Sequence, residues 1–131
     1  MSIFSQIVAG DIPCHKVAEN DEFLAFLDIM PLAKGHTLVI PKKETDYIFD
    51  LEDDAYQRLW LFAKQVAATL RAHVPCKRIG SSVIGLEVAH AHIHLIPLQQ
   101  IDDINFSKPK VAADPAELAA LARLLLKSSN Q

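Results

Sequence analysis

The sequence has few cysteines, no strong excess of charge of either sign and no long apolar run. Its two cysteines, Cys14 and Cys76, are too few for a disulfide framework and are not spaced as a zinc-binding motif. The formal net charge is −3, which gives no reason to expect nucleic acid or an anionic membrane as a partner. No apolar stretch approaches the roughly 18 residues that a membrane-spanning helix needs.

The first residues also lack the basic segment and the apolar run of a secretory signal peptide. We therefore expect a cytoplasmic protein with both thiols free. Half of the 131 residues are hydrophobic and 22% are charged, which is ordinary for a globular protein. This length fits one domain, residues 1–131, with a core of its own.

The hydrophobic pattern predicts three helices and five strands. The helices are a short one that Ser2 caps, a long one over about 53–73 with apolar residues at the 3.6 period, and a terminal one over about 114–127. The predicted strands cover about 16–18, 23–28, 36–40, 77–84 and 90–97. Short turns between neighbouring strands favour antiparallel pairing. The expected fold class is α+β: a five-stranded antiparallel sheet with one long helix packed on it and short helices near both ends.

Three of the six histidines, His90, His92 and His94, alternate with apolar residues. Strict alternation is the period of a strand, so the three imidazoles are predicted to share one face, about 6.5 Å between neighbours. The apolar residues between them would then pack into a core. A row of imidazoles on one face suits a phosphate or a metal better than it suits a core.

Three readings of this row compete. It could be a solvated surface. It could be a metal site, but three rings spread over about 13 Å are too far apart for one tetrahedral ion, so ligands from elsewhere, such as Cys14, Asp28 or Glu87, would be needed. It could be a phosphate site with a nucleophilic histidine, because imidazole is neutral near pH 7 and can form a covalent phosphoramidate. Flanking rings would then bond the non-bridging oxygens.

The stretch HAHIHLI, residues 90–96, resembles the H-x-H-x-H signature of the histidine triad (HIT) superfamily of nucleotide hydrolases and transferases, in its Hint-like form. The stretches IFSQIVAGDIP, FLDI and GHTLVIPKK resemble the family's amino-terminal helix and its second and third strands. The resemblance covers nearly the whole chain. It implies a single HIT domain over 1–131, with the triad motif at 90–96 and a helical extension at about 114–127.

The resemblance also implies roles for individual residues. His92 matches the nucleophile, His94 a phosphate-binding histidine, and His90 the histidine whose backbone carbonyl orients the nucleophile. His36 matches a fourth histidine beside the triad, and Asp28 the carboxylate that bonds the ribose hydroxyls; a turn residue at a strand end is the alternative for Asp28. The apolar walls around the base, which could equally be plain core, match Ile3, Phe4, Ile7, Phe26, Ile29 and Leu38.

Two departures from the family pattern stand out. Where zinc-containing members have two cysteines and a histidine, this chain has Ser2, Ser5 and Glu44, so no structural zinc and no cofactor are expected. The segment before the triad is shortened, and Glu87 replaces a hydroxyl residue that contacts the scissile phosphate. Our hypothesis is that burial raises the pKa of Glu87 and lets it protonate the leaving group. Ser81 or Ser82 is the candidate for the lost polar contact.

The resemblance therefore implies a hydrolase that binds an AMP-like purine nucleotide. It would cleave a nucleoside 5′-phosphoramidate, or a related nucleotidyl conjugate, to the monophosphate through a covalent His92 intermediate and without a metal. Homodimers that continue the sheet are common in the family and are expected here. The alternatives are a nucleotide sensor or scaffold with little catalysis and, third, a metal-dependent hydrolase.

Overall fold

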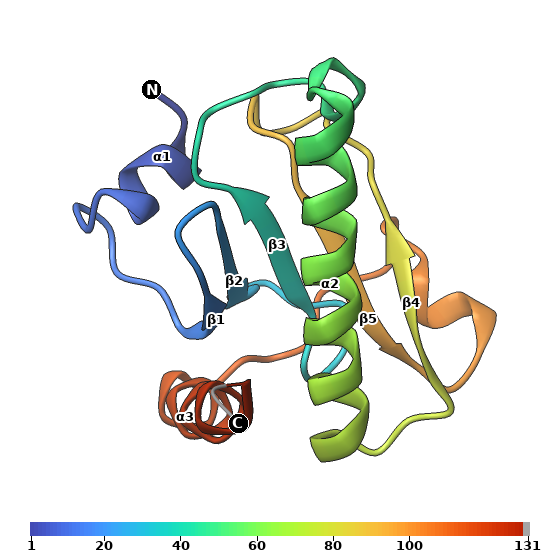
Figure 1. Ribbon diagram of the computed structural model, residues 1–131. Coiled ribbons are helices and arrows are strands. Elements are labelled where there is room, and N and C mark those ends of the chain that lie inside the picture. The colour runs from blue at the N-terminus through green and yellow to red at the C-terminus, as the bar shows by residue number, and fades with distance from the viewer. Residues whose placement is uncertain (130–131) are drawn as a thin grey trace.

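A five-stranded antiparallel sheet organises the structure, a computed structural model that describes residues 1–129 (Figure 1). The strands lie in the order β1-β2-β3-β5-β4, and every neighbouring pair is antiparallel. The α+β fold class is thus confirmed. In chain order the elements are α1 (Ile3–Val8), β1 (Lys16–Glu19), β2 (Phe23–Leu27), β3 (Thr37–Pro41), η1 (Ile48–Asp50), α2 (Asp53–His73), β4 (Arg78–Ser82), β5 (Ile93–Leu98), η2 (Ile101–Ile104) and α3 (Pro115–Ser129).

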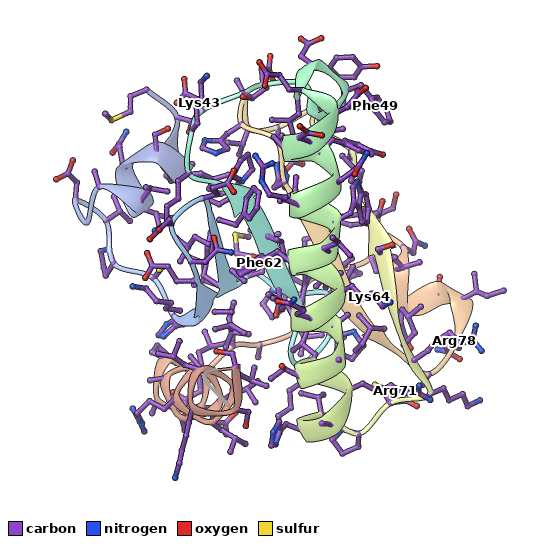
Figure 2. All side chains as sticks on the ribbon, viewed as in Figure 1. Lys43, Phe49, Phe62, Lys64, Arg71 and Arg78 are labelled. Atoms are coloured by element: carbon purple, nitrogen blue, oxygen red, sulfur yellow. The ribbon has the colours of Figure 1, made fainter. Side chains whose placement is uncertain are left out.

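The two faces of the sheet are covered by different elements. Helix α2 lies across one face (Figure 1), and Phe62 reaches from α2 toward the sheet (Figure 2), with its ring centroid 5.7 Å from that of Phe23. On the opposite face, Phe4 of α1 joins a second apolar cluster with Phe26 and Leu38. Because both faces are covered, every residue of β2 and β3 is buried. Apolar residues at both alternating positions are what such doubly covered strands require.

The long helix begins and ends where its apolar period predicts, at Asp53 and His73. The strand that carries the histidines is shorter than expected, because β5 begins only at Ile93. Before it, the backbone bonds to loops instead of to a neighbouring strand: the His90 N–H donates to Val88, and the Ala91 N–H to Thr45. His90 and His92 therefore precede the strand, and only His94 lies within it.

Helix α3 packs beside β1, β2 and α2 and buries Ala122 and Leu125. The connection over 99–113 leads from β5 to this helix and passes behind the sheet as viewed in Figure 1, on the face opposite α2. The hydrophobic pattern predicts no helix or strand over 99–113, yet the connection contains the short 3-10 helix η2. Among residues 1–129, no helix is long and apolar enough to cross a membrane.

Candidate active site

A chain of hydrogen bonds begins at a backbone amide and runs through two buried histidines. The Leu32 N–H donates to His36 Nδ1 at 3.0 Å, and His36 Nε2 lies 3.0 Å from His94 Nδ1. Because an amide can only donate, His36 Nδ1 must accept, so its single proton sits on Nε2. That proton is donated to His94 Nδ1. Because His94 Nδ1 accepts this bond, the single proton of the neutral His94 ring is on Nε2, which is left as a donor.

Both rings are held in their neutral form by burial. His36 is 2% exposed and His94 is 9% exposed. Desolvation is the main cause that lowers the pKa of His36 to about 3 and that of His94 to about 4, and the charge of Lys110 lowers both further. At neutral pH, His94 can therefore donate a hydrogen bond to an anion without carrying a positive charge.

The middle histidine of the triad has the opposite tautomer. His92 Nδ1 lies 2.7 Å from the backbone carbonyl of His90, which can only accept, so Nδ1 carries the proton. In the neutral ring, Nε2 of His92 is then the unprotonated nitrogen with a free lone pair. The ring centroids of His92 and His94 are 5.0 Å apart, although His92 precedes β5 and His94 lies within it. The lone pair and the His94 donor belong to adjacent rings.

The His90 ring is held in place by hydrogen bonds at both of its nitrogens. Its Nε2–H donates to the Pro41 carbonyl at 2.7 Å, and its Nδ1 lies 2.7 Å from the Ser2 hydroxyl. Glu44 accepts from the Ser5 hydroxyl at 2.7 Å and from the Ser2 backbone N–H, and these bonds hold the pKa of Glu44 down at about 2. Ser2, Ser5 and Glu44, which stand at the positions compared with zinc ligands in the sequence analysis, are therefore joined to one another and to His90 by hydrogen bonds. The expectation of no structural zinc stays a prediction.

Asp28 lies beside this chain of imidazoles. One carboxylate oxygen accepts from the Met30 N–H at 2.8 Å, and the other lies 3.7 Å from His36 Nε2. Burial raises the pKa of Asp28, although the Met30 bond and the charge of Lys110 lower it. Because His36 is neutral, this contact is not an ion pair. Asp28 both shapes the turn after β2 and keeps a carboxylate near the histidines.

Asp28, His36 and His94 each offer a ligand atom within 4.8 Å of the others, the arrangement of a possible metal site. Cys14 and Glu87, named above as possible ligands, do not belong to this group. A metal on His36 Nε2 would force the ring proton onto Nδ1, which faces the Leu32 N–H at 3.0 Å. Two donors would then oppose each other in a buried place. The surroundings of His36 therefore favour the hydrogen-bond chain over a metal.

The apolar residues expected to line a base pocket divide into two groups. Phe4, Phe26 and Leu38 are buried, and Ile7 packs against them. The Phe4 ring lies 5.1 Å from the His92 ring centroid to centroid, edge to face, so this cluster packs against His92. The others are open to solvent: Ile3 is 49% exposed and Ile29 is 67% exposed.

Ser82 and Glu87 both come from the altered segment before the triad, but Ser82 lies in the sheet beside His94 and Glu87 is exposed to solvent. Ser82 is the β4 partner of His94 in the strand register and therefore shares the face of the sheet with it. Ser81 pairs with Leu95 instead. Glu87 is exposed, so the burial that our acid hypothesis required is absent, and that premise was wrong. Its charge contributes to raising the pKa of Asp28.

Two residues at the site were not found from the sequence. The Phe106 ring meets the His94 ring edge to face at 4.7 Å between centroids, and Lys110 Nζ lies 5.7 Å from the Phe106 ring centroid. A single aromatic residue in the polar segment 99–113 was the only available signal. A cavity of about 240 Å³ adjoins this region, and the chain segments that line it include Asp28, His36 and Val111.

Comparison with known proteins gives consistent results. The sequence model of the HIT domain matches residues 9–101. The adenosine 5′-monophosphoramidase of Schizosaccharomyces pombe is 35% identical over 121 residues, covering 91% of each chain. A zinc-bound histidine triad protein from Mycobacterium smegmatis superposes with a TM-score of 0.82 at 28% identity, covering 98% of this chain and 93% of that one. A histidine triad nucleotide-binding protein from Sulfolobus tokodaii gives 0.81 at 26%, covering 97% and 91%.

The buried neutral histidines predict a fall in stability on mild acidification. In the unfolded chain, His36 and His94 titrate near pH 6.5, whereas in the folded protein their pKa values are about 4 or less. The unfolded state therefore binds more protons between pH 7 and pH 5, and the free energy of unfolding should fall by about 2 to 4 kcal/mol. The raised pKa of Asp28 opposes part of this change.

Urea unfolding at the two pH values measures the effect. His36→Asn should reduce the pH dependence, because it removes one of the two imidazoles. His73→Asn, at an exposed histidine on α2, should leave it unchanged. A wild-type unfolding free energy that is equal at pH 7 and pH 5 would contradict the neutral assignment.

Proposed function

The chain belongs to the HIT family, and on that basis we propose that it hydrolyses a nucleoside 5′-phosphoramidate or a related nucleotidyl conjugate. The product would be the nucleoside monophosphate, with an AMP-like purine nucleotide as the bound part. The observation that carries this proposal is the pair of tautomers at the triad. His92 Nε2 is an unprotonated nitrogen, and His94 Nε2–H is a neutral donor beside it.

The first step is attack by the His92 Nε2 lone pair on phosphorus. A bond forms between nitrogen and phosphorus, and the bond from phosphorus to the leaving group breaks with its electron pair going to the leaving group, which takes up a proton. The positive charge that develops on the ring is stabilised by the hydrogen bond that Nδ1–H donates to the His90 carbonyl at 2.7 Å. In the second step water attacks phosphorus, the bond between His92 Nε2 and phosphorus breaks with its electron pair returning to Nε2, and the proton of the water passes to solvent, which leaves the monophosphate.

Neighbouring groups would stabilise the charge on the phosphoryl oxygens. His94 Nε2–H is preorganised by the chain from Leu32, so it needs no reorientation when charge builds up. Ser82, on the same face as His94, is the proposed hydroxyl donor. Asp28 is the proposed partner of the ribose hydroxyls. The proton for the leaving group is assigned to solvent. The cytoplasmic location and the lack of a metal cofactor stay predictions.

A nucleotide sensor or scaffold is the second candidate. It is favoured by Glu87, whose carboxylate stands where the family pattern has a hydroxyl donor and whose charge acts on Asp28. An ionised carboxylate there would repel the phosphoryl group and slow attack. A sensor would bind AMP saturably without turnover, whereas the proposed hydrolase would turn over.

Adenosine 5′-phosphoramidate tests the hydrolase directly. Wild-type protein should release AMP, and a quenched reaction should give a nucleotidyl adduct on His92 by peptide mass spectrometry. His92→Ala should lose about 10³-fold or more in kcat/KM, because no other group supplies the nucleophile. His73→Ala, at an exposed histidine of α2, is the matched control and should keep full activity.

The outcomes separate the candidate functions. AMP binding without release or adduct would support the sensor and contradict the hydrolase. Activity that is abolished by a chelator and restored by zinc would support a metal-dependent hydrolase.

We also propose that two copies pair along β4, an edge strand, and the neighbouring side of α2. Leu61 is 58% exposed on α2, in the same helical stripe as Ala68 and Arg71, which border β4 beside Arg78 and Ile79. Figure 2 shows Arg71 and Arg78 on this side. Wild-type protein should sediment as a dimer, and Leu61→Asp should shift it toward a monomer. A monomeric wild type at micromolar concentration would contradict this proposal.

A further inference from the structure

The connection between β5 and α3 crosses the face of the sheet that carries the histidines. One backbone bond anchors its far end, where the Val111 N–H donates to the Pro31 carbonyl at 2.8 Å. At its start, Asp103 accepts from the backbone N–H groups of Gln99 and Gln100 at 2.7 and 3.0 Å, which closes the first turn of the connection on itself. Nearly all of this connection lies beyond residues 9–101, the part that matches the HIT domain. Its contribution to the site therefore lies outside the residues that the HIT-domain model matches.

Phe106 places the connection against the site. Its ring meets the ring of His94 edge to face at 4.7 Å and that of His36 at 6.3 Å between centroids. Lys110 Nζ lies 5.7 Å from the centroid of the Phe106 ring and 3.5 Å from the Phe106 carbonyl oxygen. The ammonium group is thus held next to the aromatic ring that contacts the phosphate-binding histidine.

The charges at the site leave a need for a cation. His36 and His94 are neutral, and Asp28 and Glu87 are acidic, so a bound phosphoryl group would meet donors but no compensating charge from these groups. The positive charge of Lys110 acts on Asp28, His36 and His94 alike. Its neighbour Lys108 is paired with Asp102 at 3.2 Å. Within residues 1–129, no carboxylate lies at salt-bridge distance from Lys110.

We propose that Lys110 binds the non-bridging oxygens of the substrate's phosphoryl group and that the connection 99–113 completes the nucleotide site. The inference rests on the proposed function for the identity of that group. An ammonium ion bonds phosphate as a point charge on a flexible stem, so the side chain can turn from the Phe106 ring toward the anion. Lys110 then supplies the positive charge that His94 and Ser82 lack.

Isothermal titration with AMP and with adenosine tests this role, because the two ligands differ only in the phosphate. Lys110→Gln should weaken AMP binding about tenfold or more and leave adenosine binding unchanged. Lys110→Arg should keep AMP affinity within about threefold of wild type, since it keeps the charge. Lys108→Gln is the matched control two residues away and should leave both affinities unchanged.

A phosphate titration keeps this test independent of the proposed hydrolysis. Inorganic phosphate should shift the imidazole resonances of His92 and His94 in the wild type. Lys110→Gln should need a phosphate concentration about tenfold higher, or more, for the same shift. This outcome would support the role of Lys110 even if no nucleotide were hydrolysed. Equal AMP and phosphate affinities in wild type and Lys110→Gln, or a wild type that binds no phosphate, would overturn the proposal. So would an equal loss in Lys108→Gln.

Discussion

The hydrogen bond from the Leu32 amide to His36 Nδ1 fixes the direction of every bond that follows it. An amide cannot accept, so His36 must donate to His94, and His94 must present its own proton on Nε2. The His90 carbonyl imposes the opposite tautomer on His92. One backbone donor and one backbone acceptor thus make adjacent, chemically similar rings unequal: one an electron-pair donor and the other a proton donor.

This arrangement depends on burial from both sides. Helix α2 covers one face of the sheet, while α1 and the connection 99–113 lie over the other. Without that cover, His36 and His94 would titrate near pH 6.5 and their hydrogen bonds would lose a fixed direction. The same burial removes positive charge from the place where the proposed phosphoryl group would bind. A cation from outside the triad would supply that charge, and we propose Lys110 for this role.

Local patterns predicted the frame of the molecule, and long-range contacts determined the rest. The apolar period of α2, the Ser2 cap and the histidine alternation are visible within a few residues. The start of β5 was predicted too early, because the backbone at Ala91 bonds to Thr45, far away in sequence. The exposure of Glu87 and the contact of Phe106 with His94 likewise depend on how distant segments pack, which no local period encodes.

The tautomers of the histidines are the most direct test of this account. Long-range nitrogen–proton NMR spectra of the uniformly labelled protein distinguish a protonated from an unprotonated ring nitrogen. We predict a proton on Nε2 of both His36 and His94 and on Nδ1 of His92 at pH 7, with His36 and His94 still neutral at pH 5. A proton on Nδ1 of His94, or a charged His94 at pH 7, would contradict it.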